Sequence, residues 1–488
     1  MNKQICISFS GNGGKTENRI MQIFRRILEE RSDVIVGIDI KAEINISMKI
    51  KSGIGKEGYE IADGTGGDIE IIGNDELGLL YGVGKFLRTS RYGNRDFIPG
   101  TWRGISIPEK EIRGVFFATH FLNYYHAASI EEIERYIEEL ALWGVNLIGF
   151  WFDMHHYKSI NDPEAIEMIG RLHAVVSCAK DIGLKVLMVS LSNEAYDNSP
   201  QELRADWTCG HDGYTKQPAG HYHVELCPNK PGGLELLLKW REEVFRAFSD
   251  VKLDYLAMAA YDQGGCTCSK CAPWGSNGYL YTLEKMVKLA KEYYPDIKSI
   301  LVTWRFDIFT TGEWDGLAKA FKECPDWVDY LLVDSSGGIS PECFINNCVT
   351  GRLPLINFPE ISMIGTVPWG GFGANPLPQY LQESYSKSKD NISGGVVYSE
   401  GIYEDINKII VNQLYWDPSR SAYDIVKEYI GYEYSIDLTE QILKVIQSLE
   451  KSLPRQEIIT GYMNYCRADN TGEVKISKFI IKNREEIN

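Results

Sequence analysis

The sequence predicts an α/β protein built on a (β/α)8 TIM barrel, with a small N-terminal α/β domain and a helical C-terminal tail. Two observations predict the barrel. Strand-like and helical segments alternate along most of the chain, and eight apolar β runs fit within about 300 residues, close to the usual span of such a barrel. A doubly wound sheet is the alternative, but the glycine-rich phosphate loop typical of that fold is missing.

Length and composition set the domain plan. The chain has 488 residues, 44% of them hydrophobic, which is enough to bury a large core in more than one domain. We place a small α/β domain at 1–105, the barrel at 106–418 and the helical region at 419–488.

The first hundred residues alternate strand and helix. "KQICISFS", "ENRIMQIFRRILEE" and "DVIVGID" come first, and the short β runs "YEIA" and "DIEIIG" then flank the turn residues "DGTGG". A helix follows, with apolar side chains at roughly helical spacing: Leu77, Leu79, Leu80, Val83 and Phe86. These elements predict a small α/β sandwich.

The barrel begins at "PEKEIRGVFFATH", and the helix after that strand has explicit boundaries. Ser129 and Glu132 form a capping box, and Gly144 ends the helix. Seven further β runs follow: "VNLIGFWF", "LKVLMVSL", "LDYLAMAA", "SILVTW", "VDYLLV", "LPLINF" and "GGVVYS". Beyond residue 418 the apolar spacing is helical, and we expect this tail to pack on the barrel or across a homodimer interface.

The net charge limits the classes of binding partner, and the N-terminal residues indicate where the protein is located. A net charge of -16 argues against nucleic acid and anionic membranes as partners, because both attract basic surfaces. The first twenty residues lack the apolar run of a signal peptide, so we expect a cytoplasmic protein. Eleven cysteines are then expected to be thiols and metal ligands rather than a disulfide framework.

Acidic and polar residues close the β runs, where a barrel carries its active site. Carboxylates that converge from several strands suit glycosidic bond hydrolysis, in which one protonates the leaving oxygen and another attacks or activates water. The candidates for this catalytic role are Asp262, Asp334, Glu360 and Glu400. The candidates for substrate binding are His120, Asp153, Glu194, Trp304, Arg305 and Trp369.

The segment "GNDELGLLYGV" and the overall plan resemble glycoside hydrolases related to family 20 hexosaminidases and family 67 α-glucuronidases. Hexosaminidases of this group carry an Asp-Glu pair after the fourth strand, whereas this chain has Asp262 followed by Gln263. The resemblance implies that Asp262 orients an acetamido group or serves as the acid itself. In the α-glucuronidase reading, Asp262 acts with Asp334 and Glu360, and Arg305 binds a sugar carboxylate.

The stretch "YDQGGCTCSKCAPWG" also predicts a metal site. Cys266, Cys268 and Cys271 bring three thiols together, and tetrahedral zinc needs a fourth ligand. The loop at 206–233 offers Cys209, His211, His221, His223 and Cys227. We favour Cys209, which would give a closed structural Zn site beside the catalytic mouth.

We therefore expect a glycosidase that acts on oligosaccharide or glycoside substrates, with exo-action on an amino sugar or a uronic acid end. Two other classes stay open. One is a zinc-dependent hydrolase of C–N bonds that uses His211, His221 and His223. The other is a barrel that binds sugar without cleaving it, since Gln263 stands where related enzymes have their acid.

Overall fold

The barrel predicted from the eight β runs is confirmed. The computed structural model describes residues 3–11, 13–38, 40–119, 123–214, 223–261, 264–322, 325–334, 353–359, 361, 376–399 and 404–451. Parallel strands form a closed barrel in the order β10-β11-β12-β13-β14-β15-β16-β9, and β16 pairs with β9 to complete the ring. Its strands are β9 (Ile112–Phe117), β10 (Leu147–Trp151), β11 (Lys185–Leu191), β12 (Tyr255–Ala259), β13 (Lys298–Val302), β14 (Tyr330–Asp334), β15 (Leu355–Phe358) and β16 (Ile392–Ser399).

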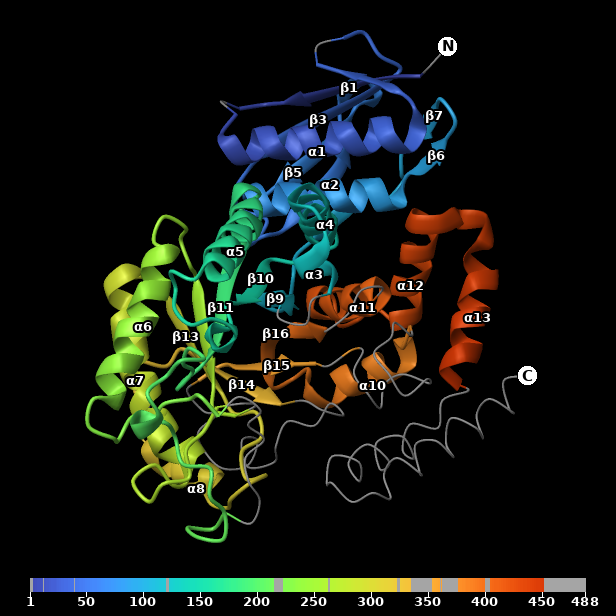
Figure 1. Cartoon of the computed structure of the whole chain (residues 1–488). Coiled ribbons are helices and arrows are strands. Elements are labelled where there is room, and N and C mark those ends of the chain that lie inside the picture. Colours follow the sequence, from blue (N-terminus) through green and yellow to red (C-terminus); the bar gives the residue numbers. More distant parts are fainter. Residues whose placement is uncertain are drawn as a thin grey trace.

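Helices surround the barrel and connect its strands (Figure 1). Helix α4 begins at the predicted capping box, in which the Glu132 amide donates to Ser129 Oγ and the Ser129 amide donates to Glu132 Oε2. The helices are α3 (Tyr124–Ala127), α4 (Ile130–Leu142), α5 (Pro163–Asp181), α6 (Gly233–Ala247), α7 (Gly278–Tyr293), α8 (Glu313–Ala320), α10 (Pro378–Ser388) and α11 (Asp405–Trp416).

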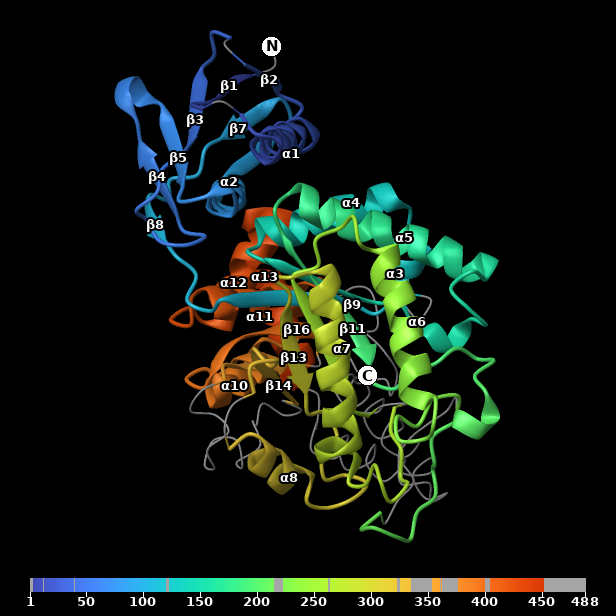
Figure 2. The ribbon, with the colours of Figure 1, turned by 90° about the vertical axis from the view of Figure 1, so that its left-hand side faces the viewer.

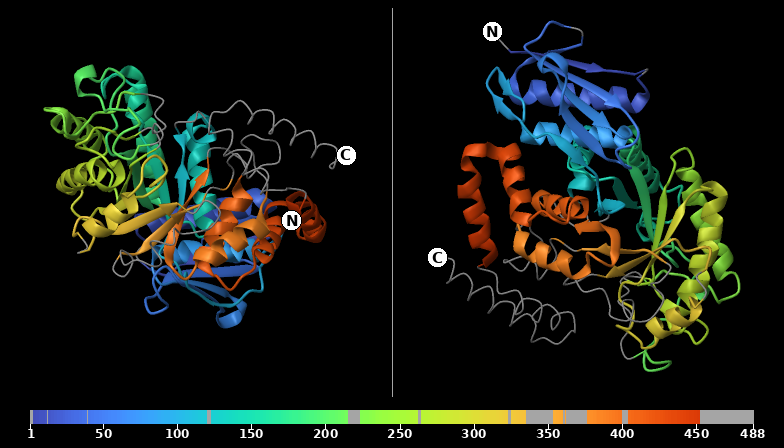
Figure 3. Two further views of the ribbon diagram at one scale, coloured as in Figure 1. Left: turned by 90° about the horizontal axis from the view of Figure 1, so that it is seen from below. Right: turned by 180° about the vertical axis from the view of Figure 1, so that it is seen from behind.

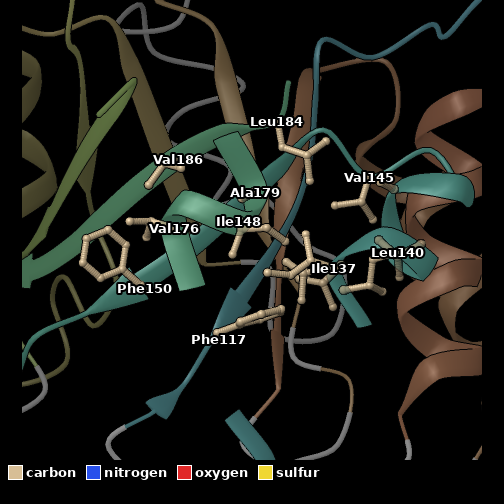
Figure 4. Close-up of a cluster of buried hydrophobic side chains, with 14 of the residues drawn as sticks. Phe117, Ile137, Leu140, Val145, Ile148, Phe150, Val176, Ala179, Leu184 and Val186 are labelled. Carbon is tan, nitrogen blue, oxygen red and sulfur yellow. The ribbon is translucent and has the colours of Figure 1, made fainter. Parts of the chain in front are cut away.

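Two apolar cores follow from the alternation of side chains along the strands. One set, which includes Phe116, Leu187 and Ile300, fills the inside of the barrel. The alternate set packs outward against the helices, as Figure 4 shows for Phe117 and Ile148 beside α4 and α5. Because the strands are buried on both faces, they read in the sequence as nearly continuous apolar runs.

The N-terminal domain is a six-stranded sheet in the order β2-β1-β3-β5-β4-β8, with β4 and β8 antiparallel to their neighbours. Its helices are α1 (Lys15–Ser32) and α2 (Glu76–Thr89), and the Asp75 side chain caps α2 by accepting from the Gly78 amide. The sheet strands are β1 (Gln4–Phe9), β2 (Ile35–Gly37), β3 (Ile44–Ile50), β4 (Tyr59–Asp63), β5 (Ile69–Gly73) and β8 (Gly104–Ser106), and β6 (Arg91–Gly93) pairs with β7 (Asp96–Ile98) in a separate hairpin.

Helix α2 lies between this sheet and the barrel (Figure 2). The contact is close at Gly84, where a Cβ atom would stand 2.1 Å from the Leu142 carbonyl oxygen. Tyr81 donates from its hydroxyl to the Val145 carbonyl at 3.2 Å, and its ring meets Trp416 edge-on with the centroids 5.1 Å apart. The small domain is therefore packed firmly on the barrel.

A charged cluster reinforces this contact. Glu428 accepts from Lys85 Nζ at 3.0 Å, from Arg88 Nε at 2.9 Å and from Arg420 Nη2 at 2.7 Å. Burial opposes ionisation of Glu428, but these cations outweigh it and hold the pKa of the carboxyl well below its usual value. The Glu428 carboxylate of α12 (Ala422–Ile430) thus links the small domain to the segment between α11 and α12.

The C-terminal helices α12 (Ala422–Ile430) and α13 (Thr439–Lys451) lie on the opposite side of the barrel from α6 and α7, as both views of Figure 3 show. They confirm a helical segment after the barrel, and residues 452–488 lie outside the described residues. Within the described ranges, no helix has both the length and the apolar character needed to cross a membrane.

Candidate functional site

The carboxyl ends of all eight strands meet at one end of the barrel, and aromatic side chains line a pocket there. We call this set the aromatic cup: Phe116, Trp151, Tyr261, Trp304, Phe358 and Tyr398. Phe116 and Tyr398 stack with centroids 5.7 Å apart, and Phe358 lies 5.0 Å from Tyr398. Ser190 and aliphatic side chains of the strands complete the lining, so the pocket is mostly apolar within the part that the structure describes.

The loop after β13 carries two predicted binding residues, Trp304 and Arg305. The Trp304 ring lines the aromatic cup, and the Arg305 guanidinium carbon lies 4.6 Å from the centroid of that ring. Both Arg305 and Asp307 have left-handed backbone conformations, with φ of 64° and 60°. Such strain in residues other than glycine is concentrated at functional sites, where surrounding structure holds it in place.

Glu194 lies in the loop just after β11, and both of its carboxylate oxygens accept hydrogen bonds. Oε1 accepts from the Met154 amide at 2.8 Å and Oε2 accepts from Arg241 Nη2 at 3.1 Å; Trp151 and Ser190 also donate to the carboxylate. Burial opposes ionisation, but His155 and Arg241 outweigh it and lower the pKa of Glu194. Because these contacts occupy the carboxylate, they favour a role for Glu194 in positioning the Trp151 ring. They make direct contact of Glu194 with a sugar less favourable.

Asp153 lies after β10 beside two histidines. Its Oδ2 is 2.7 Å from Nδ1 of the half-exposed His156 and 4.0 Å from Nε2 of the buried His155. The hydrogen bond to Asp153 raises the pKa of His156 against the effect of burial. The three side chains are close enough to share a metal ion, but the short contact of Asp153 with His156 also fits an ordinary ion pair.

Asn193 joins the loops after β11 and β12. Its side-chain amide donates to the carbonyls of Gly265 at 2.9 Å and Leu226 at 3.0 Å, and its Oδ1 accepts from the Gly265 amide at 3.0 Å. The side chain is fully buried. Asn193 therefore fixes the backbone of the two residues that immediately precede Cys227 and Cys266.

Glu313 joins the loop after β12 to the loop after β13. It accepts from the Tyr261 hydroxyl at 2.5 Å, from the Gly275 amide at 2.6 Å and from the Asp307 amide at 2.8 Å. Burial raises the pKa of Glu313 to about 7 despite these donors. Glu313 is thus the residue that holds both the cup residue Tyr261 and the strained loop of Arg305.

Glu225 is a buried carboxyl near Glu194, just before Cys227 in the chain. Only 1% of the residue is exposed, and Oε2 has no hydrogen-bond partner among the described residues. Burial, followed by the negative charge of Glu194, raises the pKa of Glu225 to about 8. Glu225 is therefore protonated at neutral pH.

The predicted thiol cluster forms, but with a different fourth cysteine. Cys266, Cys268 and Cys271 lie with Cys227 in a group whose sulfurs are all within 4.8 Å of one another. Cys209 is exposed and outside this group, so the choice of Cys209 is corrected to Cys227. The loop turns Cys227 inward, since its amide donates to the Leu203 carbonyl at 2.9 Å.

Several predicted site residues lie outside the described residues: Asp262, Glu360, Glu400, His120, Trp369 and His221. The backbone of Asp334 ends β14, but nothing is described of its side chain. Of the histidines proposed for a catalytic zinc site, His211 pairs with Asp212 at 2.9 Å and His223 meets the Trp207 ring edge-on. Among the described residues, neither histidine belongs to a potential metal-binding group.

The sequence reasoning missed the cup residues Phe116, Tyr261, Phe358 and Tyr398, and the joining residue Glu313. A signal for three of the aromatic residues was present. Phe116, Phe358 and Tyr398 stand at or next to the last residue of a β run, where a side chain that faces inward lies at the mouth of the barrel. No local signal marks Glu313, because its partners come from two other segments.

Several solved glycoside hydrolases share the fold of this chain. A GH138 enzyme targeting pectin rhamnogalacturonan II superposes with a TM-score of 0.61 at 12% identity, over 92% of this chain and 69% of that enzyme. A family 89 enzyme from Clostridium perfringens, in complex with its substrate GlcNAc-α-1,4-galactose, gives 0.60 at 15% identity, over 88% of this chain. This chain covers about half, 52%, of that enzyme.

A family 20 exo-β-N-acetylglucosaminidase from Vibrio harveyi, in complex with N-acetylglucosamine, gives a TM-score of 0.57 at 13% identity, over 92% of this chain and 75% of that enzyme. No protein-family model matches the sequence, and neither does any curated protein. At these identities the likeness shows a shared fold, which covers the small domain as well as the barrel.

Proposed function

We propose that the protein is a glycoside hydrolase that removes a terminal amino sugar, an N-acetylhexosaminide, from oligosaccharides. The observation that carries this proposal is the aromatic cup at the mouth of the barrel. Pockets for small ligands are mostly apolar with a few convergent polar groups, and the flat apolar face of a pyranose ring packs well on aromatic side chains. Solved structures of the same fold support the sugar class, because two of them hold N-acetylglucosamine or a glycoside of it.

The proposed chemistry uses the carboxyls that follow the strands. Asp262, after β12, protonates the glycosidic oxygen or orients the acetamido group of the sugar. Glu360 or Glu400 attacks the anomeric carbon or removes a proton from the attacking water, with Asp334 in support. His120, Asp153 and Trp369 are proposed to contact the sugar together with the cup residue Trp304.

A uronic acid end is the second candidate substrate, and Arg305 is the observation that favours it. Its guanidinium lies over the Trp304 ring, next to the aromatic cup. A guanidinium binds a carboxylate through two parallel hydrogen bonds, which suits recognition of a sugar acid. In this case Asp262, Asp334 and Glu360 form the catalytic set.

The test is release of nitrophenol from a panel of nitrophenyl hexosaminides, hexosides and glucuronides. We expect turnover on one sugar, reduced about 100-fold or more in Asp262→Asn and in either Glu360→Gln or Glu400→Gln. Glu202→Gln is the matched control, because Glu202 is an exposed acid in the loop after β11. Activity on glucuronides that Arg305→Met abolishes would select the second substrate.

Two results would contradict the proposal. Saturable sugar binding without any product, by a folded protein, would indicate a binding barrel. Hydrolysis of a C–N bond that a chelator abolishes reversibly, without unfolding, would indicate a metal hydrolase.

A further inference from the structure

Four cysteine sulfurs form one buried group beside the barrel mouth. Cys227 comes from the loop between β11 and α6, and Cys266, Cys268 and Cys271 come from the loop between β12 and α7. The Cys227 sulfur lies 3.8 Å from the Cys268 sulfur and 3.7 Å from the Cys271 sulfur. Cys227, Cys266 and Cys271 are buried, and Cys268 is half-buried.

These distances fit a shared metal ion and do not fit disulfides. A disulfide holds its sulfurs about 2.05 Å apart. A tetrahedral ion with zinc–sulfur bonds of about 2.3 Å instead places its sulfurs about 3.8 Å from one another. The two distances from the Cys227 sulfur, 3.8 and 3.7 Å, match the edge of that tetrahedron.

The surroundings of the sulfurs provide a second, independent observation. The Asn229 side chain donates from Nδ2 to the Cys271 sulfur at 3.2 Å, and the Asp206 amide donates to the Cys266 sulfur at 3.4 Å. N–H groups that point at sulfur stabilise the negative thiolate, which is the form that binds metal. A neutral thiol has no need of these donors and would gain more from an acceptor for its own proton.

We propose that Cys227, Cys266, Cys268 and Cys271 bind one Zn²⁺ ion in a closed structural site. Four thiolates fill the tetrahedral coordination of zinc, so no position is left for water or substrate. Formation of the site releases the thiol protons to solvent, and the ion and its ligands then carry two negative charges. The site takes no part in bond cleavage.

The ion would tie together two loops at the mouth of the barrel. Backbone hydrogen bonds already join these loops, since the Thr267 amide donates to the Asp206 carbonyl at 2.7 Å. Trp274, which follows the last cysteine, donates from Nε1 to the Ala260 carbonyl at 2.7 Å. If the proposed function holds, the zinc site fixes the loop that carries the acid Asp262, although its existence does not depend on that function.

The experiment measures metal content and metal spectroscopy on the full chain without an affinity tag. Zinc is quantified by mass spectrometry after gel filtration in metal-free buffer, for wild type, Cys227→Ser and Cys209→Ser. Cys209 is the matched control, because it is an exposed cysteine of the same loop. We expect about one zinc ion per chain in wild type and in Cys209→Ser, and a loss of most of it in Cys227→Ser.

Replacement of zinc by Co²⁺ keeps the test decisive if Cys227→Ser fails to fold. We expect wild type to show the intense visible and near-ultraviolet bands of tetrahedral cobalt bound by thiolates. Wild type without metal, or with only weak bands of octahedral cobalt, would overturn the proposal. Zinc lost in Cys209→Ser but kept in Cys227→Ser would also overturn it. Both measurements are made without sugar, so their failure is distinguishable from failure of the proposed glycosidase activity.

Discussion

Replacement of Glu225 by glutamine tests the electrostatics beside the barrel mouth. Glu225 is 1% exposed, and its Oε2 has no hydrogen-bond partner among the described residues. Burial raises the pKa of its carboxyl from 4.5 to about 8, and the charge of Glu194 adds to this effect. In the unfolded chain the same carboxyl ionises near its ordinary value, so the two states bind different numbers of protons between these limits.

The sign and size of the effect follow from this difference. Below pH 4.5 the carboxyl is protonated in both states and carries no penalty. Between the two pKa values the folded state keeps a proton that the unfolded state loses, so wild-type stability falls by about 1.4 kcal/mol per pH unit. Between pH 5 and pH 7 this amounts to about 3 kcal/mol, and the loss is complete near pH 8. Glu225→Gln removes this loss.

The assay is unfolding in urea, followed by tryptophan fluorescence at pH 5, 6 and 7. We expect the stability of Glu225→Gln to rise relative to wild type by about 3 kcal/mol from pH 5 to pH 7. Glu202→Gln, an exposed control from the same long loop, should follow wild type at each pH. A constant difference between Glu225→Gln and wild type across this range would refute the argument.

Three further changes test the contacts that hold the site and the domains. Arg241→Met should cost about 3–5 kcal/mol in unfolding experiments, because it removes the guanidinium that is paired with the buried Glu194 carboxylate, and Arg241→Lys should recover part of that loss. Asn193→Ala should cost about 2–4 kcal/mol and speed proteolysis of the two loops, since buried carbonyls and an amide lose their partner. Glu428→Gln should lower the melting temperature most at neutral pH. The difference from wild type should shrink as the pH falls below about 4.5, because Glu428 of the unfolded chain is then protonated.

For each of these three predictions, one result would contradict the reasoning. A fully stable Arg241→Met would show that the other donors to Glu194 are sufficient. Unchanged protease resistance in Asn193→Ala would show that the loops are held elsewhere. A Glu428→Gln variant as stable as wild type at neutral pH would show that its three cationic neighbours are solvated rather than paired.

Local patterns in the sequence were sufficient for the barrel strands and for the boundaries of α4. Each strand is buried on both faces, so it appears as a short apolar run, and the capping box of Ser129 and Glu132 is a local hydrogen-bonded motif. The sequence did not reveal the strands β3 and β8, because few of their side chains are buried and neither forms a clear apolar run. β3 has only two buried side chains, and β8 is three residues long and has none.

By itself the sequence determined the order of the barrel strands, the closed barrel, the acids that follow its strands and the three clustered thiols. Only the tertiary structure decided that Cys227 rather than Cys209 joins those thiols, that Glu194 is held by Arg241 and Trp151, and which rings form the aromatic cup. The physical reason is the range of the interactions. Helix caps and strand patterns depend on neighbours in the chain, whereas a thiol cluster, a buried ion pair or a pocket depends on how distant loops are folded against one another.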